Sequence, residues 1–255
     1  MYADNFVSIE YHVKSIRHLF VIGVFFSMKY NLFLFDLDDT LLDFQASEKL
    51  CFKETFINFG INDLLEDIHK TYKVENNKLW KQLEKGEVDK DFLKVERFKR
   101  TLDHHLIEIP PHKMAEFYLE QLPKNVVLIE GAVELLKHVK QFGEIGIITN
   151  GIEYTQRERI KNSDLKNYID FIAVSEECGF AKPDVRFFEF AANRSKNFVK
   201  DSAIIIGDRF DADILGANNF GIDSCWFNPH RLKNTASFKP TFEAETLAEI
   251  QRIFS

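Results

Sequence analysis

The sequence predicts an α/β fold: a Rossmann-like, three-layer core around a parallel sheet, with an all-helical domain inserted into it. Short apolar stretches without polar alternation indicate strands that are buried on both faces. From residue 131 onward, such stretches alternate with helical patterns, which is typical of a parallel sheet with right-handed crossovers. Residues 44–125, in contrast, show helical patterns and no strand-like run.

The first strand is expected at Leu32–Phe35, four consecutive large apolar residues. This run ends at two carboxylates, Asp36 and Asp38, and Asp39 and Thr40 come directly after them. Unpaired carboxylates are costly in a protein interior, so this cluster requires a cation or protons. Because open α/β sheets bind ligands at the carboxyl ends of their strands, we expect a site at this point.

The inserted region is expected to consist of several helices. Apolar residues recur at helical spacing within residues 47–59, and Gly60 follows as a helix stop. Charged helical patterns continue beyond it, with a break at Glu84–Glu87. A proline pair then precedes a last helix, which is expected at residues 112–121. We therefore interpret this region as a helical domain that sits on the sheet.

The second half of the chain is predicted to alternate between strand and helix. Strands are expected at residues 144–151, 171–175, 202–208 and 224–227. Helices are expected at residues 131–142, 153–162, 184–194, 211–220 and 246–254. Gly179–Pro183 is expected to form a loop, because Pro183 disfavours helical geometry at Lys182.

The chain is predicted to divide into three parts. These are an extension at residues 1–27, a catalytic core at residues 28–43 and 126–255, and a helical domain at residues 44–125. The apolar run at residues 19–26 lacks a small-residue cleavage site and is too short to span a bilayer as a helix. We expect the extension to be disordered or a gene-model artefact, with Met28 as the true start.

The composition is that of a globular protein, with 45% hydrophobic and 29% charged residues among 255. A formal charge of −7 argues against a nucleic acid polymer or an anionic membrane surface as a partner. Cys51, Cys178 and Cys225 are far apart and lack the spacing of metal ligands. Reduced thiols in a cytoplasmic protein are therefore expected.

Polar side chains follow the predicted strands at the points where those strands end. They are Asp36, Asp38 and Thr40, then Thr149 and Asn150, then Lys182, and finally Asp208 with Asp213. The carboxylates suit a hard cation such as Mg²⁺, the hydroxyl and amide groups suit an anionic oxygen, and the lysine can neutralise charge. Transfer of a phosphoryl group needs this set of groups.

These residues resemble the four motifs of the haloacid dehalogenase-like (HAD) superfamily. The likeness lies in Asp36-Leu37-Asp38-Asp39-Thr40, Thr149, Lys182-Pro183, and Gly207-Asp208 with Asp213, and it covers residues 28–255 in order and spacing. The branch most similar has a helical, C1-type cap after the first motif. Within it, the stretches LFDLDDTLLDF, IITNG and GIDSCWFNP resemble pyrimidine 5′-nucleotidases.

The resemblance implies a Mg²⁺-dependent phosphomonoester hydrolase that acts through an aspartyl phosphate. Asp36 is the implied nucleophile, and Asp38 is the implied general acid and base. The implied ligands of Mg²⁺ are the Asp36 carboxylate, the backbone carbonyl of Asp38 and the Asp208 carboxylate. The implied substrate is a small phosphomonoester, a (pyrimidine) nucleoside monophosphate in particular.

The remaining motif residues are implied to bind the phosphoryl group. Thr149 and the backbone near Asn150 would hold its oxygens, and Lys182 would offset the charge on nucleophile and phosphate. Asp213 would reach the metal through water. The family often has a small hydroxyl residue where this chain has Arg209, which could pair with Asp211 or Asp213 or reach the substrate.

The leaving group is expected to be recognised by the cap. Trp80, Lys85 and Arg97 are candidates for this recognition, although Trp80 is interpreted first as a core residue of the cap. Phe44 could pack in the hinge or line the cleft. Closing the cap would exclude water and bring the loop near Gly86 towards the cleft.

Three other kinds of protein share parts of this pattern. A sugar-phosphate phosphatase or a phosphomutase of the same capped fold stays open, since the same two aspartates could serve it. A 2-haloacid dehalogenase lacks an acid at the position of Asp38. A non-catalytic, phosphorylatable receiver-like domain needs its aspartate at the end of a middle strand, where IITNG and FIAVSEE have none.

Overall fold

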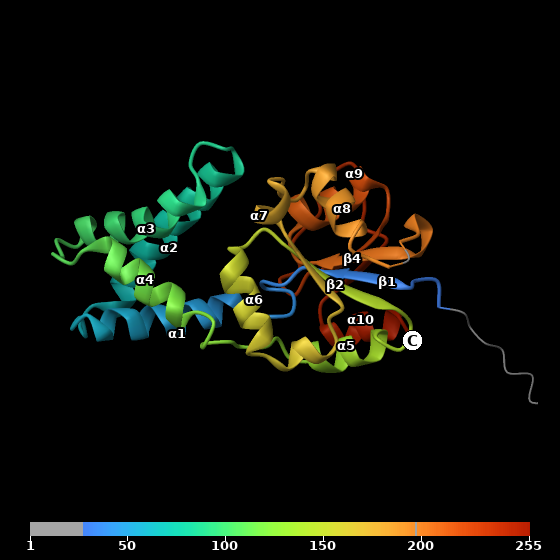
Figure 1. The fold of residues 1–255 in the computed structure, drawn as a ribbon, viewed down its shortest axis with the longest axis horizontal. Coiled ribbons are helices and arrows are strands. Elements are labelled where there is room, and N and C mark those ends of the chain that lie inside the picture. The colour runs from blue at the N-terminus through green and yellow to red at the C-terminus, as the bar shows by residue number, and fades with distance from the viewer. Residues whose placement is uncertain (1–27, 197) are drawn as a thin grey trace, which may run out of the picture.

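The structure is a computed structural model that describes residues 28–196 and 198–255 (Figure 1). The expected extension at residues 1–27 and the expected start at Met28 depend on residues outside those described. Among the described residues, no helix is long and apolar enough to cross a membrane.

Six parallel strands form one sheet, in the order β3-β2-β1-β4-β5-β6. They are β1 (Leu32–Phe35), β2 (Glu144–Thr149), β3 (Phe171–Val174), β4 (Ala203–Gly207), β5 (Asp223–Phe227) and β6 (Phe242–Ala244). Five of them lie where the sequence predicts strands. The sixth, β6, was not predicted, because it has three residues and lacks a run of apolar residues. It pairs with β5 at the edge of the sheet.

The centre of the sheet is β1, and its uninterrupted apolar sequence follows from burial on both faces. Leu32 and Leu34 belong to one apolar cluster, while Phe33 and Phe35 belong to another. Leu34 lies between Gly146 of β2 and Ile205 of β4 in the sheet register. A side chain at residue 146 would collide with its neighbours, because a Cβ there would approach the ring of Phe171 to 2.3 Å.

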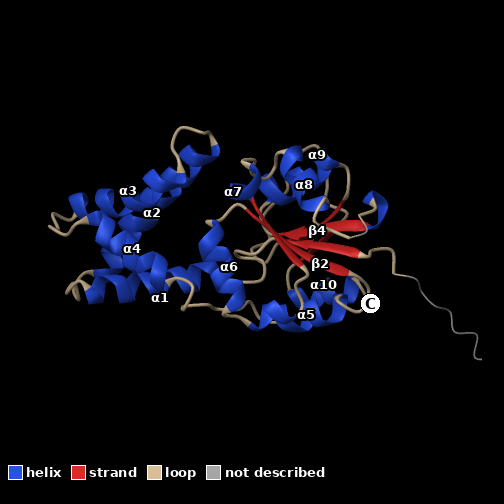
Figure 2. Ribbon diagram, in the orientation of Figure 1, coloured by secondary structure: helices blue, strands red, loops and turns tan. Residues whose placement is uncertain are grey.

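Helices cover both faces of the sheet and make the core three-layered (Figures 1 and 2). One face packs against α5 (Ala132–Val139) and α10 (Leu247–Ile253), with α6 (Glu153–Lys161) contributing Ile160. The other face packs against α8 (Val185–Ala192) and α9 (Leu215–Phe220). The predicted α/β class with a parallel sheet is confirmed. Short helical segments complete the core: α7 (Ser175–Cys178), η1 (Asp164–Asn167), η2 (Lys200–Ser202) and the π-helical turn η3 (Phe210–Ile214).

Four helices stand together to one side of the sheet in Figure 1: α1 (Phe44–Asn58), α2 (Leu65–Glu84), α3 (Lys90–His104) and α4 (Pro111–Gln121). They enclose an apolar cluster of their own, which includes Phe52, Phe56, Tyr72 and Phe98. Side-chain caps begin two of them, since Asp43 accepts from the Ala46 amide and Asp89 accepts from the Phe92 amide. We call these helices the cap helices. The division of the chain at residues 44 and 125 stays a prediction, which this grouping supports.

Candidate active site

Asp36 stands at the end of β1, directly after the last residue of the strand. Its amide still donates to the carbonyl of Ile206 in β4 at 2.9 Å, and its side chain is buried. The chain then turns tightly, with the amides of Leu41 and Leu42 donating to the carbonyl of Leu37 at 3.0 and 2.9 Å. This turn places the next carboxylates beside the end of the sheet.

Asp39 serves the turn itself. It has a positive φ of 57°, a conformation that aspartate tolerates better than most residues. Its Oδ1 accepts from the amide of Phe44, the first residue of α1, at 3.0 Å. Burial, followed by the charge of Asp38, raises the pKa of Asp39 to about 6. These contacts identify Asp39 as a residue that forms the turn.

Lys182 joins Asp36 to a second buried carboxylate, Asp213. Its Nζ donates to Asp36 Oδ1 at 2.5 Å, to Asp213 Oδ1 at 2.7 Å and to the carbonyl of Ile148 at 2.9 Å. Three acceptors therefore match the three protons of the ammonium group. Burial lowers the pKa of Lys182, but the carboxylates of Asp213 and Asp36 outweigh this effect and the pKa is raised. The lysine is a fixed positive charge beside Asp36.

Asp213 lies in η3, behind the end of β4, and is fully buried. Its Oδ2 accepts from the amide of Arg209 at 3.1 Å, so both of its oxygens have partners. Residue 207 is glycine for a local reason, since a Cβ there would approach Asp213 Oδ2 to 2.3 Å. Asp213 thus supports Lys182 from the side away from solvent.

Asp208 follows β4 and is tied to the first strand through Thr40. The Asp208 amide donates to Thr40 Oγ1 at 3.1 Å, and that hydroxyl lies 3.1 Å from Asp208 Oδ1 and 3.4 Å from Asp36 Oδ2. The indole of Trp226 donates to the Asp208 carbonyl at 2.9 Å. The end of β4 is therefore fixed against the end of β1.

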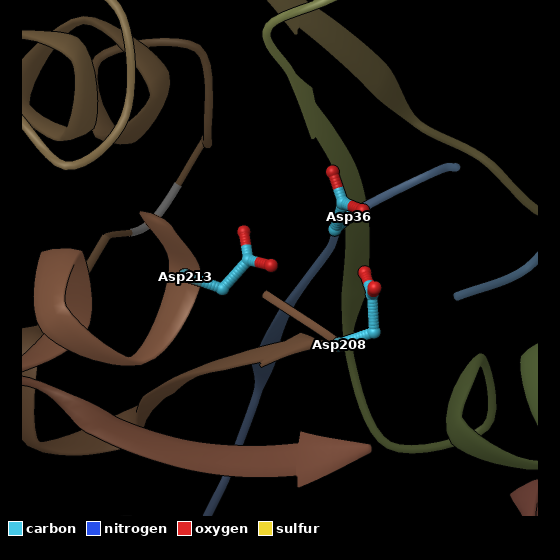
Figure 3. Close-up of side chains that lie close together, drawn as sticks. All are labelled: Asp36, Asp208 and Asp213. Carbon is cyan, nitrogen blue, oxygen red and sulfur yellow. The ribbon is translucent and has the colours of Figure 1, made fainter. Parts of the chain in front are cut away.

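The three carboxylates of Asp36, Asp208 and Asp213 gather at one point (Figure 3). Each offers an oxygen, and these oxygens lie within 4.8 Å of one another. Burial raises the pKa of Asp36 to about 7 against the opposing effect of Lys182, with Asp213 adding to the increase. Burial, then the charges of Asp36 and Asp213, raises the pKa of Asp208 to about 8. One lysine cannot neutralise three carboxylates, so the cluster fits a hard divalent cation such as Mg²⁺.

Thr149 and Asn150 end β2 beside this cluster. Thr149 Oγ1 accepts from the Gly151 amide at 3.1 Å and from Gln156 Nε2 at 2.9 Å, so its own proton remains free for an anionic oxygen. The side chain of Asn150 exchanges two hydrogen bonds with the backbone of Lys182, at 3.0 and 2.9 Å. Asn150 therefore fixes the loop that carries Lys182, through two hydrogen bonds that the sequence does not predict.

Two residues of the site were missed from the sequence, and both hold Asp38. Gln156 Nε2 donates to Asp38 Oδ2 at 2.6 Å, and Arg159 donates to the other oxygen, Oδ1. Both donors lie on α6, the helix that follows Thr149 along the chain. Their three-residue spacing puts them on one helical face, which is the only sequence signal that could have indicated them.

A cavity of about 800 Å³ connects these groups with the cap helices. On the sheet side it is lined by Asp36, Asp38, Thr149, Asn150, Lys182 and Asp208. On the cap side its walls include Phe44, Glu48, Asn76, Trp80, Gly86 and Arg97. The structure thus brings most of the predicted strand-end residues to one cavity, while Thr40 and Asp213 are buried and do not line it.

The cap candidates divide into two kinds. Trp80 lines the cavity, which corrects its interpretation as a core residue of the cap. Arg97 also lines it but is almost wholly buried, with its guanidinium 4.7 Å from the ring centroid of Tyr118. Lys85 is exposed and is not among the residues that line the cavity. Of the three candidates, Trp80 offers the largest contact surface to a ligand.

Polar contacts join the cap helices to the loops of the sheet. Lys90, at the start of α3, donates to the carbonyl of Gly151 at 2.6 Å and lies 3.4 Å from a carboxylate oxygen of Glu176. Arg209 donates to Glu84 at the end of α2 at 2.7 Å and forms a second ion pair with Asp211. Of the alternatives that the sequence left open for Arg209, the structure shows the pair with Asp211, and it adds a pair with a cap residue that was not predicted.

The haloacid dehalogenase-like hydrolase family model matches residues 33–227, which is more than half of the chain. The chain belongs to this family. The predicted membership and the prediction of a hydrolase are both confirmed.

Individual relatives of this hydrolase extend over almost the whole chain. The HAD-hydrolase YfnB of Bacillus subtilis (strain 168) is 35% identical, covering 89% of this chain and 96% of its own. A crystal structure of YfnB bound to magnesium, described as revealing interdomain movement, has a TM-score of 0.81 at 34% identity and covers 89% of this chain and 99% of that one. The pyrimidine 5′-nucleotidase PynA of Streptococcus pneumoniae (strain ATCC BAA-255 / R6) is 35% identical, covering 88% and 94% of the two chains.

A more distant relative has a different named substrate. The glyceraldehyde 3-phosphate phosphatase of Methanothermobacter thermautotrophicus is 28% identical, covering 76% of this chain and 84% of its own. The relatives of this hydrolase therefore include enzymes named for nucleotides and for sugar phosphates.

Proposed function

We propose that this hydrolase is a Mg²⁺-dependent phosphomonoesterase that acts through an aspartyl phosphate on nucleoside monophosphates, pyrimidine ones in particular. The observation that carries the proposal is the environment of Asp36. Its buried carboxylate contacts Lys182, lies beside the Asp208 carboxylate, and lines a cavity that also contains Asp38. The family and its named relatives support a hydrolase of phosphoric monoesters.

The reaction begins when an oxygen of Asp36 forms a bond to phosphorus and the bond from phosphorus to the leaving oxygen breaks. The leaving oxygen keeps the electron pair and takes a proton from Asp38. Asp38, now a carboxylate, then accepts a proton from water while the water oxygen attacks phosphorus. The bond between phosphorus and the Asp36 oxygen breaks with its electron pair going to that oxygen, which releases inorganic phosphate and restores the Asp36 carboxylate.

Asp36 and Asp208 would hold Mg²⁺ with their carboxylates, together with the backbone carbonyl of Asp38. Asp213 has partners at both oxygens in Lys182 and Arg209, which supports a role through water rather than as a direct ligand. Bound Mg²⁺ supplies positive charge that lowers the repulsion between a carboxylate and a phosphate.

The phosphoryl oxygens would contact three groups of this chain. The free proton of the Thr149 hydroxyl can be donated to one oxygen, and backbone amides near Asn150 can bind another. Lys182 places its charge next to Asp36, where the phosphoryl group would be attached. Two of these three groups stand on β2 or directly after it, so a rigid strand end defines the phosphate position.

The size and lining of the cavity support a nucleoside as the leaving group. A volume of about 800 Å³ is far larger than a phosphate or a triose phosphate requires. Trp80 offers an aromatic surface for a base, and Asn76 and Glu48 offer polar groups on the same wall. We further propose that the enzyme works in the cytoplasm, where its free cysteines would stay reduced.

Phosphate release from a panel of substrates tests this function. The panel contains UMP, CMP, AMP, ribose 5-phosphate and glyceraldehyde 3-phosphate, each with Mg²⁺ or with EDTA. We expect Mg²⁺-dependent release with the highest kcat/KM for a pyrimidine nucleotide. A preference for the sugar phosphates would favour the alternative phosphatase, and no release from any substrate would refute a phosphomonoesterase.

A further inference from the structure

The Asp38 carboxylate is anchored at both of its oxygens by side chains of a single helix, α6. Gln156 Nε2 binds Oδ2 at 2.6 Å, and the guanidinium of Arg159 binds Oδ1. The Asp38 side chain is partly exposed and lines the cavity, whereas Gln156 and Arg159 are buried. The carboxylate is therefore held from behind while its surface towards the cavity stays open.

We propose that Gln156 and Arg159 are positioning residues that fix the orientation of the Asp38 carboxylate for proton transfer to the leaving oxygen. This inference rests on the proposed function, because it needs Asp38 to be the acid of the reaction.

The orientation of the Gln156 amide is itself fixed. Its Oε1 accepts from Arg159 Nη1 at 2.9 Å, which turns Nε2 towards Asp38. The second proton of Nε2 is donated to Thr149 Oγ1 at 2.9 Å. The Gln156 amide thus binds both Asp38, the proposed acid, and the Thr149 hydroxyl, and so sets the distance between them. Those two groups must contact neighbouring atoms of the substrate, its leaving oxygen and its phosphoryl oxygen.

Arg159 is poorly explained as a stabilising core residue. Its side chain is wholly buried, and within the described part of the chain its Nε and Nη2 have no hydrogen-bond partner. Its single ion pair there is with Asp38. A buried guanidinium loses much hydration, so an apolar side chain of similar volume would serve stability as well or better. The arginine is accounted for by the carboxylate that it holds.

The same guanidinium also contacts the start of the cap helices. It lies 5.3 Å from the centroid of the Phe44 ring, within the range of a cation–π contact, and Phe44 is the first residue of α1. Asp38 is therefore oriented by a guanidinium that also packs against the first residue of the cap helices.

The test compares two leaving groups through kcat/KM, which covers the steps up to release of the alcohol and excludes hydrolysis of the aspartyl phosphate. Uridine leaves from UMP as a basic alkoxide that needs a proton, while p-nitrophenolate leaves from p-nitrophenyl phosphate as a stable anion that does not. We expect Gln156→Leu and Arg159→Met to lower kcat/KM for UMP about 10²-fold, the low end of the range for general acid catalysis. For p-nitrophenyl phosphate the loss should stay below threefold with Arg159→Met. With Gln156→Leu, which also loses the hydrogen bond to Thr149, it should be smaller than the loss with UMP. Arg159→Lys should recover part of the rate with UMP.

A matched control lies on the same helix. Arg157 forms its ion pairs with Glu153 and Glu177 instead of with Asp38, so Arg157→Met should leave both kcat/KM values near those of the wild type. In a background of Asp38→Asn, Arg159→Met should cause no further loss with UMP, because residues that act through one group are not additive. Thermal unfolding of each variant reports whether it folds. If Arg159→Met does not fold, Gln156→Leu and Arg159→Lys still test the positioning role.

The outcomes separate the two proposals. Equal losses with both substrates, or a full further loss in the Asp38→Asn background, would overturn the positioning role while leaving a phosphomonoesterase in place. A wild-type enzyme that releases phosphate from neither substrate would refute the function, and the positioning role with it.

Discussion

The two walls of the cavity are built differently. On the sheet side, the charged groups stand on strand ends or the loops after them and contact one another directly, as Asp36, Lys182 and Asp213 do. On the cap side, polar groups such as Asn76 and Glu48 are set among aromatic and aliphatic side chains of a separate core. The sheet side is suited to one fixed reaction, and the cap side to recognition of a variable leaving group. Relatives named for a pyrimidine nucleotide and for glyceraldehyde 3-phosphate align with most of this chain.

The largest difference between the walls should appear when the proposed nucleophile is removed. We expect Asp36→Asn to lower kcat by about 10³-fold or more with every substrate, because no other carboxylate of the cluster can replace the attacking oxygen. Steady-state phosphate release measures this. Asp39→Asn is the matched control, since asparagine keeps both the cap on Phe44 and the positive φ; its activity should stay within tenfold of the wild type. Substantial activity in Asp36→Asn would contradict the assignment.

Metal binding should be confined to the sheet side. Because Mg²⁺ would neutralise carboxylates that are crowded in the folded state alone, it should raise the free energy of unfolding by roughly 2.7 kcal/mol at 100 times its dissociation constant. Thermal unfolding with Mg²⁺ and with EDTA measures the effect. Asp208→Asn should remove most of it, whereas Glu48→Gln on the cap wall should not. An equal response in both variants would place the metal elsewhere.

The carboxylates of the sheet side should also control how the free energy of unfolding depends on pH. The pKa values of Asp36 and Asp208 are raised to about 7 and about 8 in the protein without metal, above the usual value of 3.8. Between pH 4 and pH 8 the folded state therefore binds more protons than the unfolded state, and the free energy of unfolding falls as pH rises. Denaturation in urea with EDTA should show a decrease of roughly 3 to 4 kcal/mol between pH 6 and pH 8.

Two changes should flatten this slope. Saturating Mg²⁺ keeps both carboxylates ionised in the folded state, and Asp208→Asn removes one of the titrating groups. A slope that is unchanged by either would show that other groups control the pH dependence.

The sheet side was also the more predictable from sequence. Asp36, Thr149 and Asp208 follow apolar runs, and because the strands are parallel, their ends had to meet at one edge. Gln156 and Arg159 have no such signal, since their place depends on how α6 is rotated against the sheet. The sequence also did not predict β6, because a three-residue edge strand has no long apolar run.

The cap side was less predictable from sequence. Helix periodicity indicates which residues are buried, but it does not indicate whether they face the cap core or the cavity. Trp80 matches a helical apolar face equally well as a core residue or as a cavity wall, and the structure places it at the wall. The contacts between the two sides, such as Lys90 with Gly151, depend on how the cap helices sit on the sheet, which no local pattern encodes.

Substrate selectivity should be weakened by a change on the cap wall. We expect Trp80→Ala to lower kcat/KM for UMP about tenfold, from lost contact with the base, while p-nitrophenyl phosphate changes by less than threefold. Lys85→Ala is the matched control from the end of the same helix, because Lys85 is exposed and outside the cavity lining. The sequence alone makes Lys85 a candidate for recognition of the leaving group, and the structure does not support that role. Equal losses on both substrates would remove Trp80 from leaving-group recognition.

The smallest effect is expected where the two walls meet. Glu84 pairs with Arg209 across the mouth of the cavity at 2.7 Å, but both side chains are more than a third exposed, and such pairs contribute about 0.2–1 kcal/mol. Glu84→Gln should therefore raise KM for UMP less than about fivefold and leave kcat unchanged, with the difference disappearing at high salt because exposed charges are screened. Glu87→Gln is the control, an exposed acid in the turn after α2 that lies outside the cavity lining. A large fall in kcat for Glu84→Gln would mean that Arg209 takes part in the reaction itself, and the boundary between the two walls would then have to be redrawn.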